Sequence, residues 1–488
     1  MMTSPDSTAR RVAVIGGGIA GLAAAHRIVE LDPACELTLF EAGPRLGGVL
    51  ATVHEDGFQV EQSADNFITT IPWGLDLCRR LGLGERLVQT NPACRRTFVV
   101  RGGRLCRLPD GFLMMAPTRL WPLAVTPLLS PWGKLRAALE YFIPPRAGDG
   151  DESMAAFVRR RLGREAFDRL VEPLVSAVYA ADLEKLSVLA TLARFREMEL
   201  DHGSLIRAMR HQMKNRPAAS RESGARYSMF VTLEDGLSSL VDALAARLPA
   251  GAVRLNTPVT RIERCGEQWT VETKGEGGRG KAEDRAAAQS PFPLPPSAFD
   301  AVVLATPSPV TANLLRPTDP TLADQLASIA HSGTAIVSLG YRREQIGHPL
   351  DGMGMVVPAV EQSPILACSF SSRKYPHRAP EGKELLRVFV GGARRPEMAE
   401  MDDQQLQSLV LRELSERLQI RGEPCYGNIA HWPGTMPQYH VGHKELVAGI
   451  EARVAALPHL ALAGNAYHGV GLPDCIHGGE QAAERTMG

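Results

Sequence analysis

The feature that most constrains this fold is a glycine turn between an apolar strand and a helix near the start of the chain. Residues 12–15 are apolar and mostly β-branched, which predicts a short buried parallel strand. Gly16, Gly18 and Gly21 follow in the pattern G-x-G-x-x-G, and a run of small residues then predicts a helix. A second predicted strand ends at Glu41. Together these features form a dinucleotide-binding fingerprint in its required strand–helix–strand context.

Each residue of the fingerprint has a physical role. Gly16 permits the tight turn, Gly18 lets the backbone approach a pyrophosphate, and Gly21 lets the helix pack close to the strand. The helix N-terminus presents free N–H groups and partial positive charge to the phosphates. Glu41 follows Gly21 by 20 residues, which places a carboxylate where ribose hydroxyls are bound.

The residues directly after Glu41 favour a flavin over a nicotinamide cofactor. They read E-x-x-x-R-x-G-G and end at Arg45, Gly47 and Gly48. Glycines at this place let the chain pass close to a bound cofactor. Arg45 is expected to pair with a phosphate.

Composition excludes several other classes of protein. Lys plus Arg and Asp plus Glu number 54 each, so the net charge gives no reason to expect a nucleic-acid partner. The eight cysteines form no C-x-x-C pair and none has zinc-ligand spacing to a histidine, so no metal site is expected. Free thiols and the lack of a recognisable signal peptide predict a reducing, cytoplasmic location.

Residues 112–132 are the most apolar long stretch, but four prolines interrupt it. Prolines would break a membrane-spanning helix. The favoured interpretation is packing inside a helical lobe, and the alternative is a surface that touches a membrane or receives an apolar ligand.

Along the rest of the chain, apolar spacing predicts a mostly helical segment over 110–215 and an α+β segment over 334–440. The closing stretch, 460–487, again reads strand, glycine-rich turn and helix. Shorter predictions are helices over 75–89 and 232–248, and a hairpin around the Gly102–Gly103 turn. Residues 274–297 are rich in Gly, Ala, Pro and charge, and are predicted to form a variable loop.

Beyond the fingerprint, four segments resemble the oxygen-dependent porphyrinogen oxidases of haem biosynthesis, within the amine-oxidase-type FAD superfamily. These segments are 60–67 (VEQSADNF), 179–182 (YAAD), 436–444 (MPQYHVGHK) and 469–476 (GVGLPDCI). The run at 436–444 is the most specific of them. The resemblance extends from Val12 to the C-terminus.

This resemblance implies a fold of class α/β with α+β. It would contain a discontinuous Rossmann-like FAD-binding domain, an α+β substrate domain, and an inserted helical lobe that is membrane-associated in many relatives. The implied parts are 1–90, 216–310 and 436–488 for the FAD-binding domain, 91–109 and 311–435 for the substrate domain, and 110–215 for the helical lobe.

The implied activity is the oxidation of a porphyrinogen, coproporphyrinogen III or protoporphyrinogen IX, in three two-electron steps. Each step reduces non-covalent FAD, and O2 reoxidises it with release of H2O2. Covalent attachment through Cys475 is not expected, because the neighbours of this cysteine differ from those in covalent amine oxidases. Since the flavin itself accepts the hydride, no catalytic side chain is expected. The expected partners are a tetrapyrrole and O2, with peripheral membrane contact and transient contact with other haem-pathway enzymes as further expectations.

Two rival functions remain open from the sequence. One is another flavin amine oxidase or desaturase, although no aromatic cage is identifiable in the sequence. The other is a non-catalytic binding protein of the same fold, against which the intact glycines and Glu41 argue.

Carried over by position, the FAD contacts would come from the first turn, the loop after Glu41, the segment after residue 60, and the closing turn. They are Gly16, Gly17, Gly18, Ile19, Ala20, Gly21, Glu41, Ala42, Arg45, Gly48, Val49, Gln62, Ser63, Ala64, Asp65, Val259, Trp432, Val470, Gly471 and Leu472.

Substrate contacts are expected from Asn66, His440 and the segment Arg95-Arg96-Thr97. Eukaryotic-type relatives carry an arginine where the alignment places Thr97, and bacterial coproporphyrinogen-type relatives carry a small hydroxyl residue there. This difference favours coproporphyrinogen III as substrate, although the adjacent Arg95 and Arg96 could take the place of that arginine. His440 and His443 are expected to be structural rather than catalytic bases.

Overall fold

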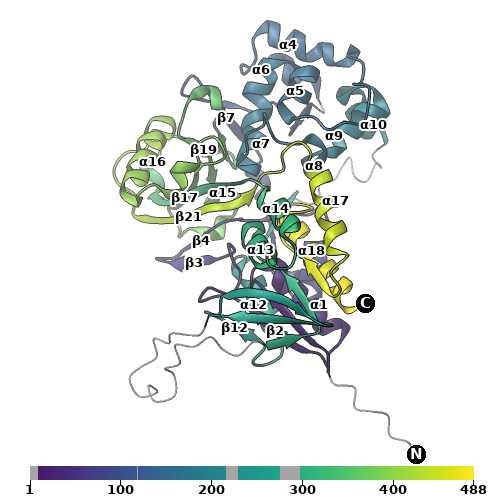
Figure 1. The fold of residues 1–488 in the computed structure, drawn as a ribbon. Coiled ribbons are helices and arrows are strands. Elements are labelled where there is room, and N and C mark those ends of the chain that lie inside the picture. The colour runs from purple at the N-terminus through teal and green to yellow at the C-terminus, as the bar shows by residue number, and fades with distance from the viewer. Residues whose placement is uncertain (1–8, 118, 216–228, 275–296) are drawn as a thin grey trace, which may run out of the picture.

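The computed structural model describes residues 9–117, 119–215, 229–274 and 297–488 (Figure 1). The variable loop predicted over 274–297 therefore lies almost wholly outside the described residues. The helical lobe forms one end of the molecule and a small parallel sheet the other, and a larger sheet lies beside the lobe (Figure 1).

The parallel sheet contains five strands in the order β12-β2-β1-β16-β22. Their bounds are Val253–Arg254 (β12), Glu36–Phe40 (β2), Arg11–Ile15 (β1), Ala301–Leu304 (β16) and Leu460–Leu462 (β22). Strands from both ends of the chain thus flank β16, as Val12 pairs with Ala301 and Leu460 with Val302. Both faces of the central strands β1 and β16 are buried, which explains the uninterrupted apolar sequences of residues 12–15 and 301–304.

Helices cover both faces of this sheet. On one face lie α1 (Ile19–Leu31), α12 (Ser238–Ala245) and α18 (Leu472–Met487), packed on Val12, Val14 and neighbouring strand residues. On the other face lie α13 (Ser308–Leu315), α14 (Pro320–Ala327) and α17 (His443–Val454). A small antiparallel sheet covers that second face too, made of β13 (Val259–Cys265), β14 (Gln268–Thr273) and β15 (Ser297–Phe299).

The larger sheet has seven strands in the order β21-β17-β20-β19-β18-β7-β8. Their bounds are Tyr426–Pro437 (β21), His331–Arg342 (β17), Lys383–Gly391 (β20), Ile365–Phe370 (β19), Gly354–Val356 (β18), Thr97–Arg101 (β7) and Arg104–Arg107 (β8). One face packs against α16 (Asp403–Leu418) through alternating residues such as Leu386 and Val388. The opposite face, which includes Val99 and Ala367, packs against the helical lobe. Strand alternation therefore assigns each residue of this sheet to one of two environments.

The helical lobe begins with the hairpin β9 (Phe112–Leu113) and β10 (Ala116–Pro117). It continues through α3 (Leu120–Val125), α4 (Pro131–Ala138), η3 (Leu139–Phe142), α5 (Met154–Leu162), α6 (Arg164–Ala166), η4 (Phe167–Val171), α7 (Glu172–Tyr179), α8 (Val188–Thr191), α9 (Ala193–His202) and α10 (Leu205–Asn215). Its core contains a fully buried ion pair, in which Arg161 Nε donates to Glu140 Oε1 at 2.9 Å. Glu140 also accepts from the backbone N–H of Leu205 at 2.8 Å, so one carboxylate pairs with a cation and caps α10.

The remaining elements connect these parts. They are β3 (Thr52–Glu55), β4 (Phe58–Glu61), β5 (Phe67–Ile68), α2 (Trp73–Arg80), η1 (Gly84–Arg86), β6 (Leu87–Gln89), η2 (Pro92–Cys94), β11 (Phe230–Leu233), η5 (Arg343–Gln345), η6 (Ala359–Glu361), α15 (Ser371–Lys374), η7 (Pro376–Arg378) and η8 (Pro396–Glu400).

Two predicted helices were wrong in extent. The helix predicted over 75–89 ends at Arg80, because Gly82 adopts a positive φ of 79°, and residues 87–89 become strand β6. The helix predicted over 232–248 begins only at Ser238, because residues 230–233 pair with β5 and β6. In both cases pairing between distant segments outweighs local helical preference.

The architecture confirms the predicted α/β class with an α+β part and a helical lobe. The exact domain boundaries stay a prediction. Helices α13 and α14 pack on the parallel sheet although they lie at or beyond the predicted boundary at residue 310. Among the described residues, no helix is long and apolar enough to cross a membrane.

Candidate functional site

Two glycine-rich turns lie at the carboxyl edge of the parallel sheet, on either side of β16. The first turn, residues 16–21, follows β1, and the closing turn, residues 464–471, follows β22. In open α/β sheets this edge is where ligands bind. A Cβ added to Gly18 would meet no atom within 4 Å, and the same holds for Gly464, whose φ is 129°. By contrast, a Cβ on Gly16 would lie 2.7 Å from the carbonyl oxygen of Ala305. The first turn therefore has one face packed on the sheet and one face open, as an approaching pyrophosphate requires.

Glu41 holds the first turn together. Its carboxylate accepts from the backbone N–H of Gly17 and of Gly43, each at 2.7 Å. One carboxylate thus links the glycine turn to the loop that follows β2. This placement at the end of β2 is the one predicted for a ribose-binding acid.

Arg45 has a structural role that the sequence did not indicate. Its guanidinium donates to the carbonyl oxygens of Leu46, Gly48 and Leu50, at 2.7 to 3.0 Å. These bonds hold the glycine loop in shape, and Gly47 N–H in turn donates to Gly17 O at 2.8 Å. The predicted phosphate contact of Arg45 stays a prediction, whereas its contact with its own loop is observed.

The segment after β4 is held by side chains of the larger sheet and its neighbouring turns. Trp432 Nε1 donates to the carbonyl oxygen of Gln62 at 2.6 Å, and Arg387 Nη2 donates to that of Ser63 at 2.6 Å. Arg378 Nη2 donates to the carbonyl oxygen of Asp65 at 2.7 Å. We call residues 62–65 the clamped loop, because three of its four carbonyls are bound by donors from β20, β21 and η7.

The Asp65 side chain lies among three cations. Its carboxylate is 3.2 Å from Lys374 Nζ, 3.3 Å from Arg378 Nη1 and 3.5 Å from Arg387 Nη1. Burial alone would raise the pKa of Asp65, but the three positive charges outweigh it and hold that pKa well below its usual range. Asp65 is therefore ionised at neutral pH. Glu61, the other carboxylate nearby, lies 3.7 Å from Arg378, and burial raises its pKa.

The clamped loop and the closing turn meet at the end of β21. Trp432 of that strand binds the clamped loop, while three residues further on Thr435 O accepts from Asn465 of the closing turn at 3.3 Å. Tyr439 Oη donates to Asn465 O at 2.6 Å. Val470 packs on the same apolar cluster as Phe389 of β20. These contacts bring together two segments about 400 positions apart in the sequence.

The other predicted cofactor residues fall into three places. Ile19, Ala20 and Gly21 form the first turn of α1, and a Cβ on Gly21 would overlap the carbonyl oxygen of Gly16. Ala42, Gly48 and Val49 lie exposed in the loops after β2. Val259 is partly buried at the start of β13. Gly471 and Leu472 form the N-terminus of α18, and Ala64 is exposed in the clamped loop.

These positions fit FAD. Two helix N-termini, α1 and α18, face one edge of the sheet, and open space lies over Gly18 and Gly464. Helix N-termini bind phosphates and other groups with negative charge. The first turn, Glu41 and the Arg45 loop would hold the adenosine and pyrophosphate, and the closing turn and clamped loop would hold the ring system.

The predicted substrate residues are not all brought together. Thr97 lies on the same face of the larger sheet as Val99, and this face packs against the helical lobe. Arg96 instead pairs with Asp351 at 2.7 Å and is half exposed. His440 forms an isolated bridge with Leu186 of the lobe, and burial lowers its pKa.

Asn66 donates to Asp65 Oδ1 at 2.6 Å, next to the clamped loop. Arg95 lies in the turn between η2 and β7. His443 is buried and stacks on Tyr439 with ring centroids 3.9 Å apart, as expected for a structural histidine.

Sequence reasoning missed Lys374, Arg378 and Arg387. Arg387 carried a signal, because it interrupts the apolar run Leu385-Leu386-Arg387-Val388-Phe389. A charged residue is rarely fully buried unless it is paired, and Arg387 is fully buried. Lys374 and Arg378 carried no such signal, because they sit in a short polar segment.

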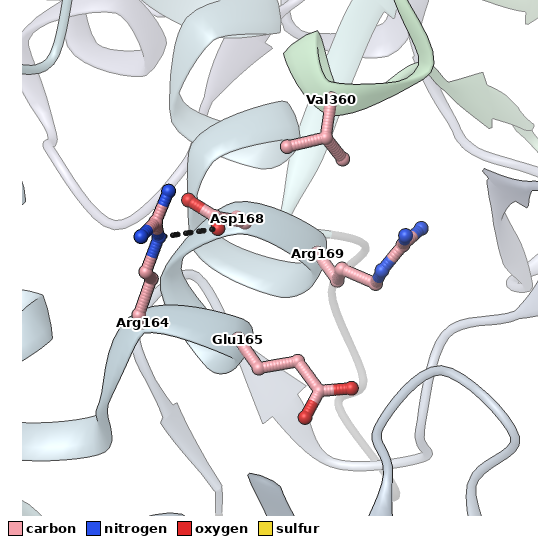
Figure 2. Close-up of a pocket in the computed structure, with 5 residues that line it drawn as sticks. All are labelled: Arg164, Glu165, Asp168, Arg169 and Val360. Carbon is pink, nitrogen blue, oxygen red and sulfur yellow. Dashed lines mark ion pairs between the residues drawn. The ribbon is translucent and has the colours of Figure 1, made fainter.

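A separate cavity lies on the lobe surface, where η4 faces η6 (Figure 2). Its volume is about 360 Å³, and it is lined by Arg164, Glu165, Asp168, Arg169 and Val360. Arg164 pairs with Asp168 at 3.5 Å, and Arg169 with Glu361 at 2.8 Å. Four of its five lining residues are charged, its arginines are paired with carboxylates, and none of its lining residues belongs to the two glycine turns. In the described residues, no group of three or more His, Cys, Asp or Glu is placed to hold a metal ion.

Comparison with known families gives one match over nearly the whole chain. Residues 19–487 match the family described as flavin containing amine oxidoreductase. Among curated proteins, coproporphyrinogen III oxidase from Bacillus subtilis (strain 168) is 34% identical over 491 residues, which cover 98% of each chain. Protoporphyrinogen oxidase, chloroplastic, from Nicotiana tabacum is 31% identical over 498 residues, which cover 97% of this chain and 85% of that protein.

Among solved structures, a suggested protoporphyrinogen oxidase from Exiguobacterium sp. 255-15 superposes with a TM-score of 0.84. It is 32% identical, and the match covers 98% of both chains. The resemblance inferred from the sequence is therefore confirmed at the level of family and fold.

Proposed function

Since the chain belongs to the flavin containing amine oxidoreductase family, and is thereby an FAD-dependent oxidoreductase, we propose that it oxidises coproporphyrinogen III to coproporphyrin III. The electron acceptor in this proposal is O2, and the co-product is H2O2. Removal of six electrons and six hydrogens from one porphyrinogen consumes three O2 and yields three H2O2, so atoms and electrons balance. Protoporphyrinogen IX is the alternative substrate, because relatives named for both reactions match the chain.

The observation that carries this proposal is the pattern on the lobe-facing surface of the larger sheet. Strand register aligns an apolar row, Val99, Val356, Ala367 and Phe389. The neighbouring row on the same face is polar or small: Thr97, Gly354, Ser369 and Arg387. Val99, Val356 and Ala367 are covered by the lobe, whereas Phe389, Thr97 and Ser369 are partly exposed. Partly exposed apolar and hydroxyl groups on one face suit a tetrapyrrole ring with carboxylate side chains.

The position of Thr97 favours coproporphyrinogen III. Coproporphyrinogen III carries four propionates, whereas protoporphyrinogen IX carries two propionates and two vinyl groups. Thr97 and Ser369 are both partly exposed on this face, so their hydroxyls are available to donate to further carboxylates. A small side chain at position 97 also leaves room for a propionate, which needs more space than a vinyl group.

When bound, FAD supplies the hydride acceptor and delivers the electrons to O2. The protein's own residues orient and enclose the reactants. Phe389 of β20 and Val470 of the closing turn present apolar surface in one cluster, which would exclude water from a reactant bound there. The clamped loop keeps a fixed shape through its three carbonyl contacts.

The decisive experiment compares kcat/KM for the two porphyrinogens by following porphyrin fluorescence in air-saturated buffer, with H2O2 measured alongside. We expect faster oxidation of coproporphyrinogen III and one H2O2 per electron pair. Thr97→Val should reduce the ratio of the two kcat/KM values, whereas Thr321→Val, an exposed position on α14 that packs on the parallel sheet, should leave this ratio unchanged. A higher kcat/KM for protoporphyrinogen IX would reverse the substrate assignment.

We also propose peripheral contact with a membrane through the lobe. Trp121 of α3, Trp132 of α4 and Phe142 of η3 are 76%, 79% and 74% exposed. Residues 132, 135, 139 and 142 recur at helical spacing, so α4 and η3 present one apolar stripe. Exposed tryptophans are typical of the membrane–water interface.

The compartment proposed for this reaction is the cytosol. All eight cysteines lie in the described residues, and none forms a disulfide. Contact with other enzymes of haem biosynthesis stays a prediction.

A further inference from the structure

The clamped loop is surrounded by more positive than negative charge. Lys374, Arg378 and Arg387 face Asp65 at 3.2 to 3.5 Å, and the second carboxylate, Glu61, lies beyond hydrogen-bond distance of Arg378 at 3.7 Å. Three cations therefore stand against two carboxylates. Because the site is buried, water screens this excess poorly.

Arg387 is incompletely satisfied within this group. Its Nη2 binds Ser63 O, but its Nε and Nη1 make no hydrogen bond to any described residue although both atoms are buried. Nη1 has only the 3.5 Å ion pair with Asp65. A buried guanidinium with unfilled hydrogen-bond donors is costly unless a partner is supplied. An acceptor or a negative charge that arrives with a ligand would supply that partner.

Strand alternation shows which way Arg387 faces. Leu386 and Val388 point to the core beneath α16. Arg387 and Phe389 lie on the opposite face, and the Arg387 guanidinium is 5.4 Å from the Phe389 ring centre. Phe389 and Val470 of the closing turn pack on the same cluster. The unfilled donors of Arg387 thus lie on the side where the closing turn and the clamped loop meet.

The titration behaviour of the group is consistent with a positive local potential. Burial, with a contribution from neighbouring arginines, lowers the pKa of Lys374, and burial also lowers the pKa of Arg387. The pKa of Asp65 is lowered despite its burial. Only the lowered pKa of Asp65 reports the three neighbouring positive charges directly, and such charges favour a negative group close to them.

We propose that Arg387 is a positioning residue for the bound FAD, which fixes the clamped loop through Ser63 and, with Lys374, supplies positive charge that stabilises the reduced, anionic flavin. Positive charge near the reactive end of a flavin makes the flavin easier to reduce. The inference rests on FAD binding at this site but not on which porphyrinogen is the substrate.

The test measures the two-electron reduction potential of bound flavin, together with FAD affinity and the thermal midpoint, in purified holoenzyme. Arg387→Gln should weaken binding of reduced relative to oxidised flavin at least tenfold, which corresponds to a fall of about 30 mV for a two-electron couple. Arg387→Lys retains the charge and should recover most of the potential.

The matched control is Arg417→Gln on α16. Arg417 is also largely buried, pairs with Glu413 at 2.8 Å and has an unpaired Nε, but it lies on the other face of the sheet. Its substitution should leave the potential unchanged. Lys374→Met removes a positive charge but no hydrogen bond to a carbonyl of the clamped loop, and it should also lower the reduction potential of the flavin. This second variant keeps the proposal testable if Arg387→Gln does not fold.

An unchanged potential in fully flavin-loaded Arg387→Gln or Lys374→Met would overturn the proposal. So would a raised KM for the porphyrinogen at unchanged potential, which would place Arg387 against substrate instead. Failure of the unmodified protein to bind FAD would instead refute the cofactor assignment. This result is distinguishable from failure of the Arg387 proposal, because the unmodified protein is measured before any variant.

Discussion

Substitution of Gly18 should separate cofactor binding from folding. Gly18 has φ −70° and ψ 176°, which any residue can adopt, and a Cβ there would enter open space. Gly18→Val should therefore cost the fold only about 0.5–1 kcal/mol, chiefly as a poorer helix N-cap. The branched side chain would, however, fill the space that a pyrophosphate needs.

The expected loss of FAD affinity follows from the hydrogen bonds displaced. Each charge-assisted bond from a backbone N–H to phosphate contributes about 1.5–3 kcal/mol. Loss of two such bonds amounts to about 3–6 kcal/mol, which raises the dissociation constant by about a hundredfold to ten-thousandfold. Flavin fluorescence and absorbance after desalting measure this directly.

Gly16→Ala provides the contrast. Gly16 has a φ of 106°, and its added Cβ would press on a backbone carbonyl at 2.7 Å. The backbone strain of about 1–2 kcal/mol and the overpacking of about 1–3 kcal/mol should both reduce stability. We expect Gly18→Val to be folded and colourless, and Gly16→Ala to unfold at lower temperature. Stoichiometric FAD in Gly18→Val would refute the reasoning about the open face of the turn.

Three further outcomes are expected. Glu140→Gln should lower the free energy of unfolding by about 3 kcal/mol in urea titrations because it removes the nearer of the two buried carboxylates paired with Arg161 and leaves only Glu199, at 3.4 Å, whereas Glu184→Gln, in an exposed pair, should cost less than about 1 kcal/mol. Burial lowers the pKa of His443 from 6.5 to about 4, so the unfolded chain takes up the proton first and stability falls as pH drops through this range; the loss should be about 2 kcal/mol between pH 7.5 and pH 5, and His443→Gln should remove that part of it. Trp132→Ala should reduce co-sedimentation with anionic vesicles, and equal binding by the variant would argue against the lobe as the contact surface.

Local patterns in the sequence determined the cofactor class and much of the fold. The first turn was readable because Gly16, Gly18 and Gly21 obey steric rules that act within a few residues, and the structure places Glu41 at the end of β2 as this rule requires. The apolar runs of β1, β16 and β22 identified a buried parallel sheet for the same reason, since both faces of such strands need apolar residues.

Tertiary structure alone decided what surrounds the clamped loop. Lys374, Arg378 and Arg387 lie more than 300 positions from Asp65, and nothing local in the sequence requires cations at those three places to converge on it. Their convergence depends on the register of β20 and on the packing of η7, which involve contacts between distant segments. The same physical reason explains why β6 and β11 replaced predicted helix: pairing energy from remote strands is absent from any local pattern. The sequence thus predicted a dinucleotide site at the glycine turn, and the fold decided which charges surround the clamped loop.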